Sequence, residues 1–305
     1  MNPRRKWVRR SLRNLSGDLL PQGHRACPHT VGRMLRPLGF GLRGNIKRLS
    51  GPPHPDREAQ FQHIAGQRQS FPAKGQPILS IDAKKKELLG NFKNAGATWC
   101  RTPESVNTYD FIADAQCRAT PYGSYDLLTN HGQVCVGTSA DTAAFAAAAL
   151  ENWWQGPGKR AYPAAREVLL LADGGGSNGY RVRLWKRSVQ RVADHTGLAV
   201  TVCHYPRGAS KWNPVEHRLF SQISRNWAAV PLRTLDTMRA CLRGTKTQTG
   251  LRVTAHHLDG TYPTRQKVSD QEMTQLNLQR HDICPKWNYT IRPHTPTLNP
   301  SNLRS

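Results

Sequence analysis

Three acidic residues stand where a carboxylate could do chemistry. Asp173 follows a short apolar run, Val168 to Ala172, and precedes the glycine-rich stretch 174–179. Asp82 lies in another apolar segment, although aspartate is disfavoured within strands, and Glu216 falls in the first turn of a predicted helix. Carboxylate oxygens bind hard cations such as Mg²⁺ or Mn²⁺. Two such ions about 4 Å apart would activate a water or a 3′-hydroxyl and stabilise the leaving oxygen in phosphodiester chemistry.

Each acid also has a purely structural explanation. Asp82 could form a salt bridge with the lysines at 84–86. Glu216 lies three residues after Asn213, so it could be the capping-box partner of that asparagine. The two roles of Glu216 are compatible, because a carboxylate in a first turn is stabilised by the helix dipole in either case. Asp173 has fewer alternatives, since a glycine-rich turn after a buried strand rarely needs a structural acid.

The glycines after Asp173 favour a close approach of a ligand or another backbone, because they carry no side chain. We assign this role to Gly174, Gly175 and Gly176. The same stretch matches the GxGxxG pattern of dinucleotide-binding proteins, with Asp194 as the acid that follows. However, Asp194 falls inside a predicted helix, and the pattern follows other strands instead of opening the domain. A nicotinamide enzyme is therefore the weaker interpretation.

The histidines and cysteines do not favour zinc or disulfides. His204 and His217 flank the candidate site and Cys203 adjoins His204, but no ligand pair has the usual zinc spacing. We interpret them as sheet and helix residues. The seven cysteines are odd in number and scattered, which argues against a disulfide framework and for a reducing compartment.

The hydrophobic pattern predicts the elements that must position the acids. In chain order these are a strand over 78–82, a hairpin over 121–128 and 134–137, a helix over 141–154, a strand over 168–172, a helix over 180–195, a strand over 198–205 and a helix over 211–227. A meander followed by βα alternation implies an α/β fold with a mixed sheet flanked by helices. This is the order of the ribonuclease H-like fold. Its first and fourth strands are adjacent, so Asp82 and Asp173 would meet, and Glu216 would close the site.

The charge points to a polyanionic partner. The formal net charge is +24, and residues 1–50 hold 12 basic residues and one acid, which favours nucleic acid over membrane. Two short amphipathic helices, over 11–20 and 30–38, fit a helix-turn-helix, although any basic helical hairpin would look alike. The residues expected to bind DNA are Arg9, Arg10, Arg13, Arg33, Arg36, Lys84 and Lys85, with Lys211 on a phosphate and Trp212 stacked on a base. Simple packing of Trp212 against the protein is an equally good interpretation.

We predict four regions along the chain. These are a basic helix-turn-helix segment at 1–50, a proline-rich linker at 51–76 around a short helix over 57–64, the catalytic core at 77–228 and a C-terminal extension at 229–305. The extension holds a capping box at Ser269 and a short strand over 287–291. No apolar segment follows the basic N-terminus, and the longest apolar run is too short for a bilayer. We therefore expect a soluble, intracellular protein.

Six motifs resemble the Rhodopirellula-type DDE transposases of bacterial insertion sequences. They are IDAKKKELLGNFKNAG, PYGSYDLLTN, LLLADGGGSNGYRVRLWK, TVCHYPRGASKWNPVEHRLFSQISRNW, KVSDQEM and KWNYTIRP. The resemblance runs from about Trp7 to His294 and implies a ribonuclease H-like core whose triad is Asp82, Asp173 and Glu216. It also implies Mg²⁺ as cofactor, replaceable by Mn²⁺, and joining of the element's 3′-hydroxyls to target DNA. Double-stranded DNA would be the partner of a homo-oligomer in the bacterial cytoplasm, associated with the nucleoid.

The chain departs from this family at its start. Members generally have further helical DNA-binding sequence before the stretch that corresponds to Trp7, so we expect either a shortened copy or a gene whose start is wrongly placed. Two alternatives remain beside an active transposase. One is a nuclease of the same fold that cuts without joining, and the other is an inactive DNA-binding remnant.

Overall fold

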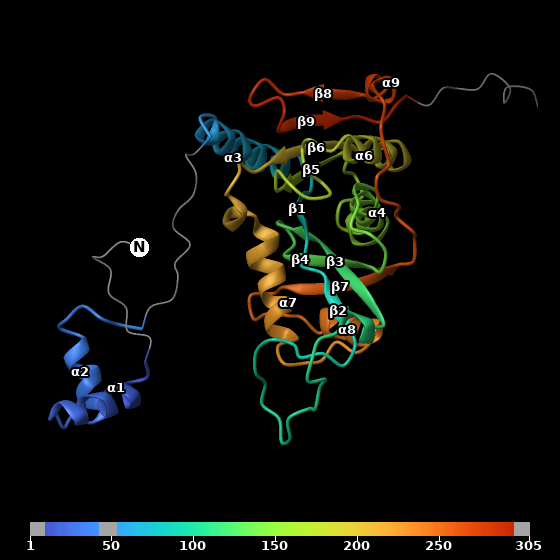
Figure 1. Cartoon of the computed structure of the whole chain (residues 1–305). Helices are drawn as coiled ribbons and strands as arrows, with labels where there is room; N and C mark the ends of the chain where they lie inside the picture. The colour runs from blue at the N-terminus through green and yellow to red at the C-terminus, as the bar shows by residue number, and fades with distance from the viewer. Residues whose placement is uncertain (1–9, 43–53, 296–305) are drawn as a thin grey trace, which may run out of the picture. The chain divides into compact units, whose positions relative to one another are not determined.

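The computed structural model describes residues 10–42 and 54–295, so Arg9 lies outside the described residues. The chain forms two compact units, Met1–Gly51 and Pro52–Ser305, which are described separately below (Figure 1). None of the described helices is long and apolar enough to cross a membrane.

The first unit contains two short helices, α1 (Leu12–Leu19) and α2 (Pro28–Leu35). Ser11 caps α1 as predicted, accepting a hydrogen bond from the Asn14 N–H at 3.1 Å. The helix α2 begins two residues before the predicted start, because Pro28 has the backbone geometry favoured at the first helical position. The helices pack closely where Gly32 meets Leu12. Assignment of this pair as a DNA-binding helix-turn-helix stays a prediction.

The second unit is built on one mixed sheet of nine strands. The strands are β1 (Ile78–Ala83), β2 (Glu87–Leu89), β3 (Cys117–Asp126), β4 (His131–Gly137), β5 (Glu167–Ala172), β6 (Ala199–His204), β7 (Arg252–Leu258), β8 (Leu278–Arg280) and β9 (Asn288–Ile291). Their order is β7-β4-β3-β1-β5-β6-β9-β8, with β2 paired to β3. The central five strands confirm the predicted ribonuclease H-like arrangement, in which β1 is antiparallel to β3 and parallel to β5.

Helices cover both faces of this sheet (Figure 1). The helices described in this unit are α3 (Arg57–Ala73), α4 (Ala143–Trp153), α5 (Lys159–Ala161), α6 (Arg183–Thr196), α7 (Ser221–Asn226), α8 (Leu235–Arg243) and α9 (Asp270–Thr274), with π-helical segments at Trp154–Gly158 and Val215–Phe220. Side chains of β5 alternate between the two faces. Leu170 packs in the core with α4 and α6, whereas Leu169 packs with α3. The continuous apolar run of β5 follows from this burial on both faces.

Three stretches differ from the predicted organisation. The stretch 51–76, predicted as a linker, contains α3, whose Ile64 and Phe71 are buried in the core. The helix α4 is capped by Thr142 instead of Asp141. The stretch 229–305, predicted as an extension, supplies β7, β8 and β9 to the main sheet. The predicted capping box is confirmed, since Ser269 and Glu272 bond each other's backbone at the start of α9.

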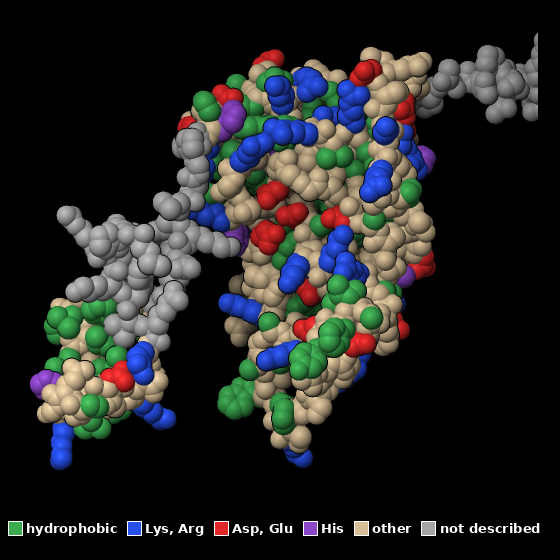
Figure 2. All heavy atoms as spheres, viewed as in Figure 1, with side chains coloured by type: hydrophobic (Ala, Val, Ile, Leu, Met, Phe, Trp, Pro, Cys, Tyr) green, Lys and Arg blue, Asp and Glu red, His purple; other side chains and the backbone are tan. Residues whose placement is uncertain are grey.

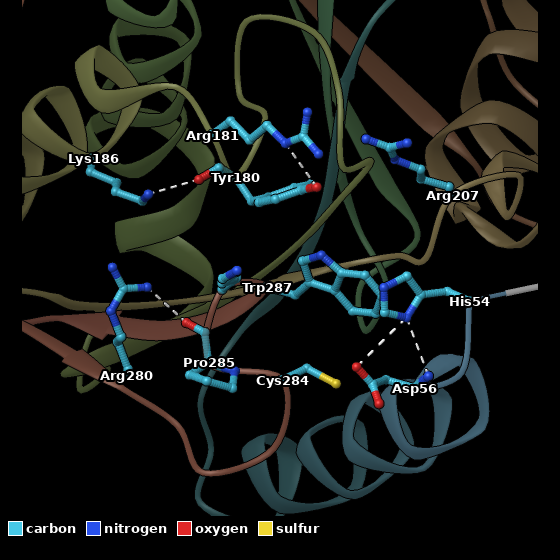
Figure 3. A pocket seen from close by; sticks show the side chains of 11 residues that line it. His54, Asp56, Tyr180, Arg181, Lys186, Arg207, Arg280, Cys284, Pro285 and Trp287 are labelled. Carbon is cyan, nitrogen blue, oxygen red and sulfur yellow. Dashed lines mark hydrogen bonds and ion pairs between the residues drawn. The ribbon is translucent and has the colours of Figure 1, made fainter.

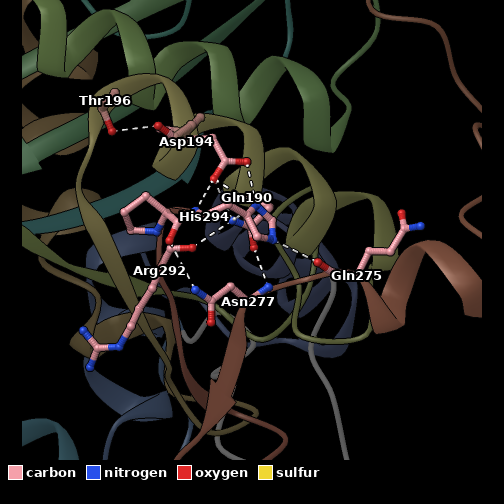
Figure 4. A network of polar contacts seen from close by, with 9 residues as sticks. Gln190, Asp194, Thr196, Gln275, Asn277, Arg292 and His294 are labelled. Atoms are coloured by element: carbon pink, nitrogen blue, oxygen red, sulfur yellow. Dashed lines mark hydrogen bonds and ion pairs between the residues drawn. The ribbon is translucent and has the colours of Figure 1, made fainter. Parts of the chain in front are cut away.

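A polar network ties the C-terminal segment to α6 (Figure 4). Gln190 donates to the Arg292 carbonyl at 2.8 Å and accepts from the Asn277 N–H at 2.8 Å. Asp194 accepts from the backbone N–H of His294 at 2.8 Å and lies 3.2 Å from its ring Nδ1. This pairing gives Asp194 a structural partner, which removes the acid on which the dinucleotide-binding interpretation depended.

Candidate active site

Strand register brings two of the three acids together. β1 and β5 run parallel with Ile81 opposite Ala172, so the next position along each strand is Asp82 and Asp173. Both lie at the carboxyl edge of the sheet, where open α/β sheets place their ligands. The sequence-based placement of these two residues therefore agrees with the structure.

The third acid is carried over the sheet by the π-helical segment Val215–Phe220. Its start is fixed to β1, because the Ser80 hydroxyl accepts from the Val215 N–H at 2.9 Å and donates to the Asn213 side chain. Its far end sits close to the hairpin, because a Cβ at Gly123 would lie 2.5 Å from the Phe220 ring. These contacts hold Glu216 beside Asp82.

Burial and mutual repulsion dominate the electrostatics of the acids. Burial, together with the neighbouring charges of Asp173 and Glu216, raises the pKa of Asp82 to about 7, against the opposing hydrogen bond from the Ala83 N–H at 2.8 Å. Burial and the charge of Glu216 also raise the pKa of Asp173, while a hydrogen bond from Asn213 Nδ2 at 3.3 Å opposes this. Two desolvated carboxylates, with a third carboxylate beside them, favour a bound cation.

Two alternative roles for the acids are wrong. Lys84 lies 3.1 Å from Glu87 and 4.7 Å from the ring centroid of Trp227, so the lysine pairs there and leaves Asp82 free. The Asn213 side chain bonds Ser80 and Asp173 instead of capping the helix, so Glu216 is not its capping-box partner. Both acids are thus available to a ligand.

A buried histidine supports the backbone at Asp173. His204 is fully buried, and burial lowers its pKa to about 4, so the ring is neutral at neutral pH. Its Nδ1 lies 3.0 Å from the Asp173 carbonyl oxygen and its Nε2 lies 3.3 Å from the Tyr289 hydroxyl. The ring therefore donates to Asp173 and accepts from Tyr289. The sequence indicated only a sheet residue, because its partners are distant in the chain.

The glycine loop forms one wall of a cavity of about 610 Å³ that reaches Asp82 and Asp173. Gly176 has φ +74°, a conformation that favours glycine, and a Cβ at Gly179 would lie 3.1 Å from the Gly174 carbonyl. A Cβ at Gly175 would meet only open space. The loop can therefore let a phosphodiester backbone approach the acids.

The oxygen donors fit a hard divalent cation such as Mg²⁺ or Mn²⁺. Within residues 10–42 and 54–295, no three His, Cys, Asp or Glu side chains already converge on a single metal position. The fit rests on the donor chemistry and on the raised pKa values of Asp82 and Asp173. Asp82, Asp173 and Glu216 are the residues that would hold the metal.

The remaining predicted DNA contacts fall in several places. Arg10 forms an exposed ion pair with Asp18 at 3.2 Å. Trp212 is 42 % exposed, and the cationic groups of Arg57 and Lys211 lie 4.9 and 4.1 Å from its ring centroid. Three arginines of the first unit and one lysine after β1 are exposed, namely Arg13, Arg33, Arg36 and Lys85. On the catalytic unit, a group of acidic side chains is surrounded by lysines and arginines (Figure 2).

A ribonuclease H-like sheet with two aspartates on adjacent strands and a glutamate on a covering helix defines the DDE class of enzymes. The chain belongs to the family described as the Rhodopirellula transposase DDE domain, whose family model matches residues 1–293. The protein is therefore a transposase, a metal-dependent enzyme of DNA cleavage and transfer. No curated protein matches the chain.

Solved structures of one transposase show similarity to the chain at low sequence identity. The Mos1 transposase paired-end complex with left transposon end has 14% identity and a TM-score of 0.45, covering 79% of this chain and 72% of that one. The Mos1 strand transfer complex has 14% identity and a TM-score of 0.43, covering 79% and 71%. The mariner Mos1 paired-end complex with Mg has 13% identity and a TM-score of 0.45, covering 79% and 73%.

Proposed function

We propose that this transposase cuts the ends of its insertion sequence and joins the freed 3′-hydroxyls to target DNA in a single site. The observation that carries the proposal is the juxtaposition of Asp82 and Asp173 at the sheet edge, with Glu216 facing them. Two Mg²⁺ ions, replaceable by Mn²⁺, would supply activation of the attacking hydroxyl and stabilisation of the leaving oxygen. The same three carboxylates would serve both cutting and joining.

The protein groups around the acids position the DNA and the acids themselves. The glycine loop leaves room for the phosphodiester backbone, and exposed Arg181 and Arg207 line the same cavity and can pair with phosphates. Asn213 and His204 fix the side chain and the backbone of Asp173. Arg13, Arg33 and Arg36 would hold duplex DNA outside the cavity. We also propose a homo-oligomer on paired element ends, acting at the nucleoid.

Joining separates a transposase from a nuclease of the same fold. The test mixes the protein with Mg²⁺, a labelled DNA that carries the element's terminal inverted repeat and an unlabelled plasmid. Covalent transfer of label to the plasmid is the expected result, and it should disappear in Glu216→Gln. Cleavage of the labelled DNA without transfer would contradict the proposal and indicate a nuclease, and DNA binding without cleavage would indicate a remnant.

A further inference from the structure

A second cavity adjoins the catalytic one. Its volume is about 730 Å³, and it shares Tyr180, Arg181 and Arg207 with the cavity over the acids. The other walls come from the start of α3, from α6 and from the turn between β8 and β9 (Figure 3). Any ligand in this cavity is therefore a direct neighbour of whatever the carboxylates hold.

Unpaired cations dominate the charge of the second cavity. Five basic side chains and one acid line it, namely Arg181, Lys186, Arg207, Arg280, Lys286 and Asp56. None of these five cations forms an ion pair with any carboxylate in the described part of the chain, while Asp56 lies 3.6 Å from His54. Burial and the charges of Arg280 and Arg183 lower the pKa of Lys186. Convergent cations without counter-charges favour an anionic ligand.

One wall of the cavity is aromatic. The rings of His54 and Trp287 lie 4.7 Å apart between centroids, and Tyr180 meets Trp287 edge-on at 6.3 Å. The Arg181 guanidinium lies 5.3 Å from the Tyr180 ring centroid and donates to its hydroxyl at 3.0 Å. Aromatic rings beside arginines are typical of sites that stack nucleic-acid bases and pair with their phosphates.

The size and rigidity of the cavity restrict the ligand further. Its volume lies in the range of about 300–1,000 Å³ that holds single small ligands, and a DNA duplex cannot enter it. Lys186 donates to the Tyr180 carbonyl at 2.7 Å, and Arg280 donates to the Pro285 carbonyl at 3.0 Å. The walls are therefore held in place before any ligand arrives, which reduces the entropy lost on binding.

We propose that this cavity binds one unpaired nucleotide of the DNA strand that enters the catalytic site. Its base would lie against the exposed His54 and half-buried Tyr180 rings, on which the buried Trp287 packs, and its phosphates would pair with Arg280 and Arg207. The adjacent phosphodiester would then reach the acids through the shared wall. This inference rests on the proposed cleavage of DNA by the carboxylates, because that function makes the ligand a neighbour of the scissile phosphate.

The test compares two DNAs that share one short duplex, of which one is blunt and the other carries a single-stranded thymidine tail. Binding is measured by fluorescence anisotropy with a metal chelator present, so no cleavage occurs. The full-length protein should bind the tailed DNA about tenfold more tightly than the blunt DNA, as expected for one stacked base. Arg280→Glu should reduce this ratio to near one.

Arg191→Glu is the matched control, because Arg191 is also exposed but lies on α6 outside the cavity. It makes the same change of charge, so it should weaken binding of both DNAs alike and preserve the ratio. Equal thermal unfolding of the two variants confirms that both are folded. A ratio near one in the wild type, or an unchanged ratio in Arg280→Glu, would overturn the proposal.

Two further outcomes separate this site from the catalytic function. Free thymidine monophosphate that abolishes the preference at micromolar concentration would contradict the proposal, because the cavity would then serve a free nucleotide. If the preference is present but Mg²⁺-dependent cleavage is absent, the nucleotide site stands and the proposed chemistry fails. If cleavage is present but the preference is absent, the nucleotide site alone fails.

Discussion

At the scale of single residues, the three acids proposed as catalytic repel one another, and a bound metal ion would relieve this repulsion. Asp82 is desolvated and faces two other carboxylates, so its ionised form is unfavourable without a cation. Asn213 donates a hydrogen bond to the Asp173 carboxylate, and His204 donates one to the Asp173 backbone carbonyl. The site is therefore arranged for binding a cation and not for stability of the empty protein.

The raised pKa of Asp82 predicts a pH-dependent stability. With a folded-state pKa of about 7 and an unfolded value near 3.9, the folded state binds the extra proton between these values. The metal-free protein therefore loses stability as pH rises from about 4 to about 7. Asp82→Asn removes the charge, and we expect it to raise the free energy of unfolding at pH 8 by about 2–4 kcal/mol, with little change at pH 4.

Urea unfolding in a metal chelator at pH 4 and pH 8 measures this difference. Addition of Mg²⁺ at pH 8 should stabilise the wild type more than the Asp82→Asn variant. A variant no more stable than the wild type at pH 8 would contradict the account of this carboxylate.

The acids could be predicted from the sequence, but their supporting contacts could not. Asp173 follows an apolar run and precedes glycines, which is a local pattern that fixes both the strand and its end. The bonds from Ser80 to Asn213 and from His204 to Tyr289 join residues far apart in the chain. No local propensity encodes such pairs, so Asn213 appeared to be only a helix cap.

At the scale of elements, close packing decides where the third acid lies. The π-helical segment Val215–Phe220 approaches the β3–β4 hairpin at Gly123 and Gly132, where a Cβ would lie 2.5 Å from Phe220 and 2.4 Å from Leu219. The stiff Phe220 ring cannot give way as easily as the end of the Leu219 side chain. The two glycines therefore differ in how strongly they constrain Glu216.

We predict that Gly123→Ala lowers the rate of DNA cleavage about 100-fold, because a shift of about 1 Å in a catalytic group has an effect of this size. Gly132→Ala is the matched control, and its loss should be much smaller. Single-turnover cleavage with saturating protein measures both rates. Equal rates in the two variants would show that Phe220 does not set the position of Glu216.

The contact between α6 and the C-terminal segment predicts a second pH effect. Hydrogen bonds to Asp194 and to the Gln275 carbonyl raise the pKa of His294, so its stabilising effect is complete below about pH 6.5 and is lost as pH rises through the raised value. Hydrogen bonds from His294 and Gln190 lower the pKa of Asp194, although its partial burial acts in the opposite direction. The stability that the ionised Asp194 contributes is therefore lost only at acidic pH. His294→Ala should therefore lower the melting temperature at pH 5.5 more than at pH 8.5. The same decrease at both values would count against an ionised pair.

Elements with strong patterns were predictable and edge elements were not. The run before Asp173 and the hairpin β3–β4 were predicted from their apolar residues and turn signals. The helix α3 was missed beyond its first turns because prolines flank it and Pro72 lies in its last turn. The strands β7 and β8 are not predicted, because both are partly exposed edges of the sheet. The alternation of β7 is short and ends in two histidines, and β8 has only three residues.

At the scale of the whole molecule, basic side chains are suited to binding DNA phosphates, whereas the acidic side chains are suited to holding metal ions. The chain carries a net charge of +24, and on the catalytic unit a group of acidic side chains lies among lysines and arginines (Figure 2). Contacts with phosphates release counterions, so affinity for DNA should fall steeply with salt. We expect the acids to need a metal ion between them and a phosphate, because both groups are negatively charged.

We predict that replacing Arg13, Arg33 and Arg36 together by alanine weakens DNA binding and lowers the slope of log affinity against log salt by about 3, close to 0.9 for each lost phosphate contact. Titration of a short duplex at several salt concentrations measures the slope. An unchanged slope would show that these arginines do not contact DNA phosphates, which would remove the first unit from the binding surface.

The central claim is that Asp173 belongs to a metal-dependent DNA-cutting site. The most direct measurement incubates supercoiled plasmid with wild type or Asp173→Ala in Mg²⁺ or Mn²⁺ and follows nicked and linear forms, with DNA binding measured in parallel. We expect metal-dependent cutting by the wild type, and a loss of at least about 1,000-fold in the variant with binding nearly intact. Equal cutting by both proteins, or loss of binding together with cutting, would contradict this claim.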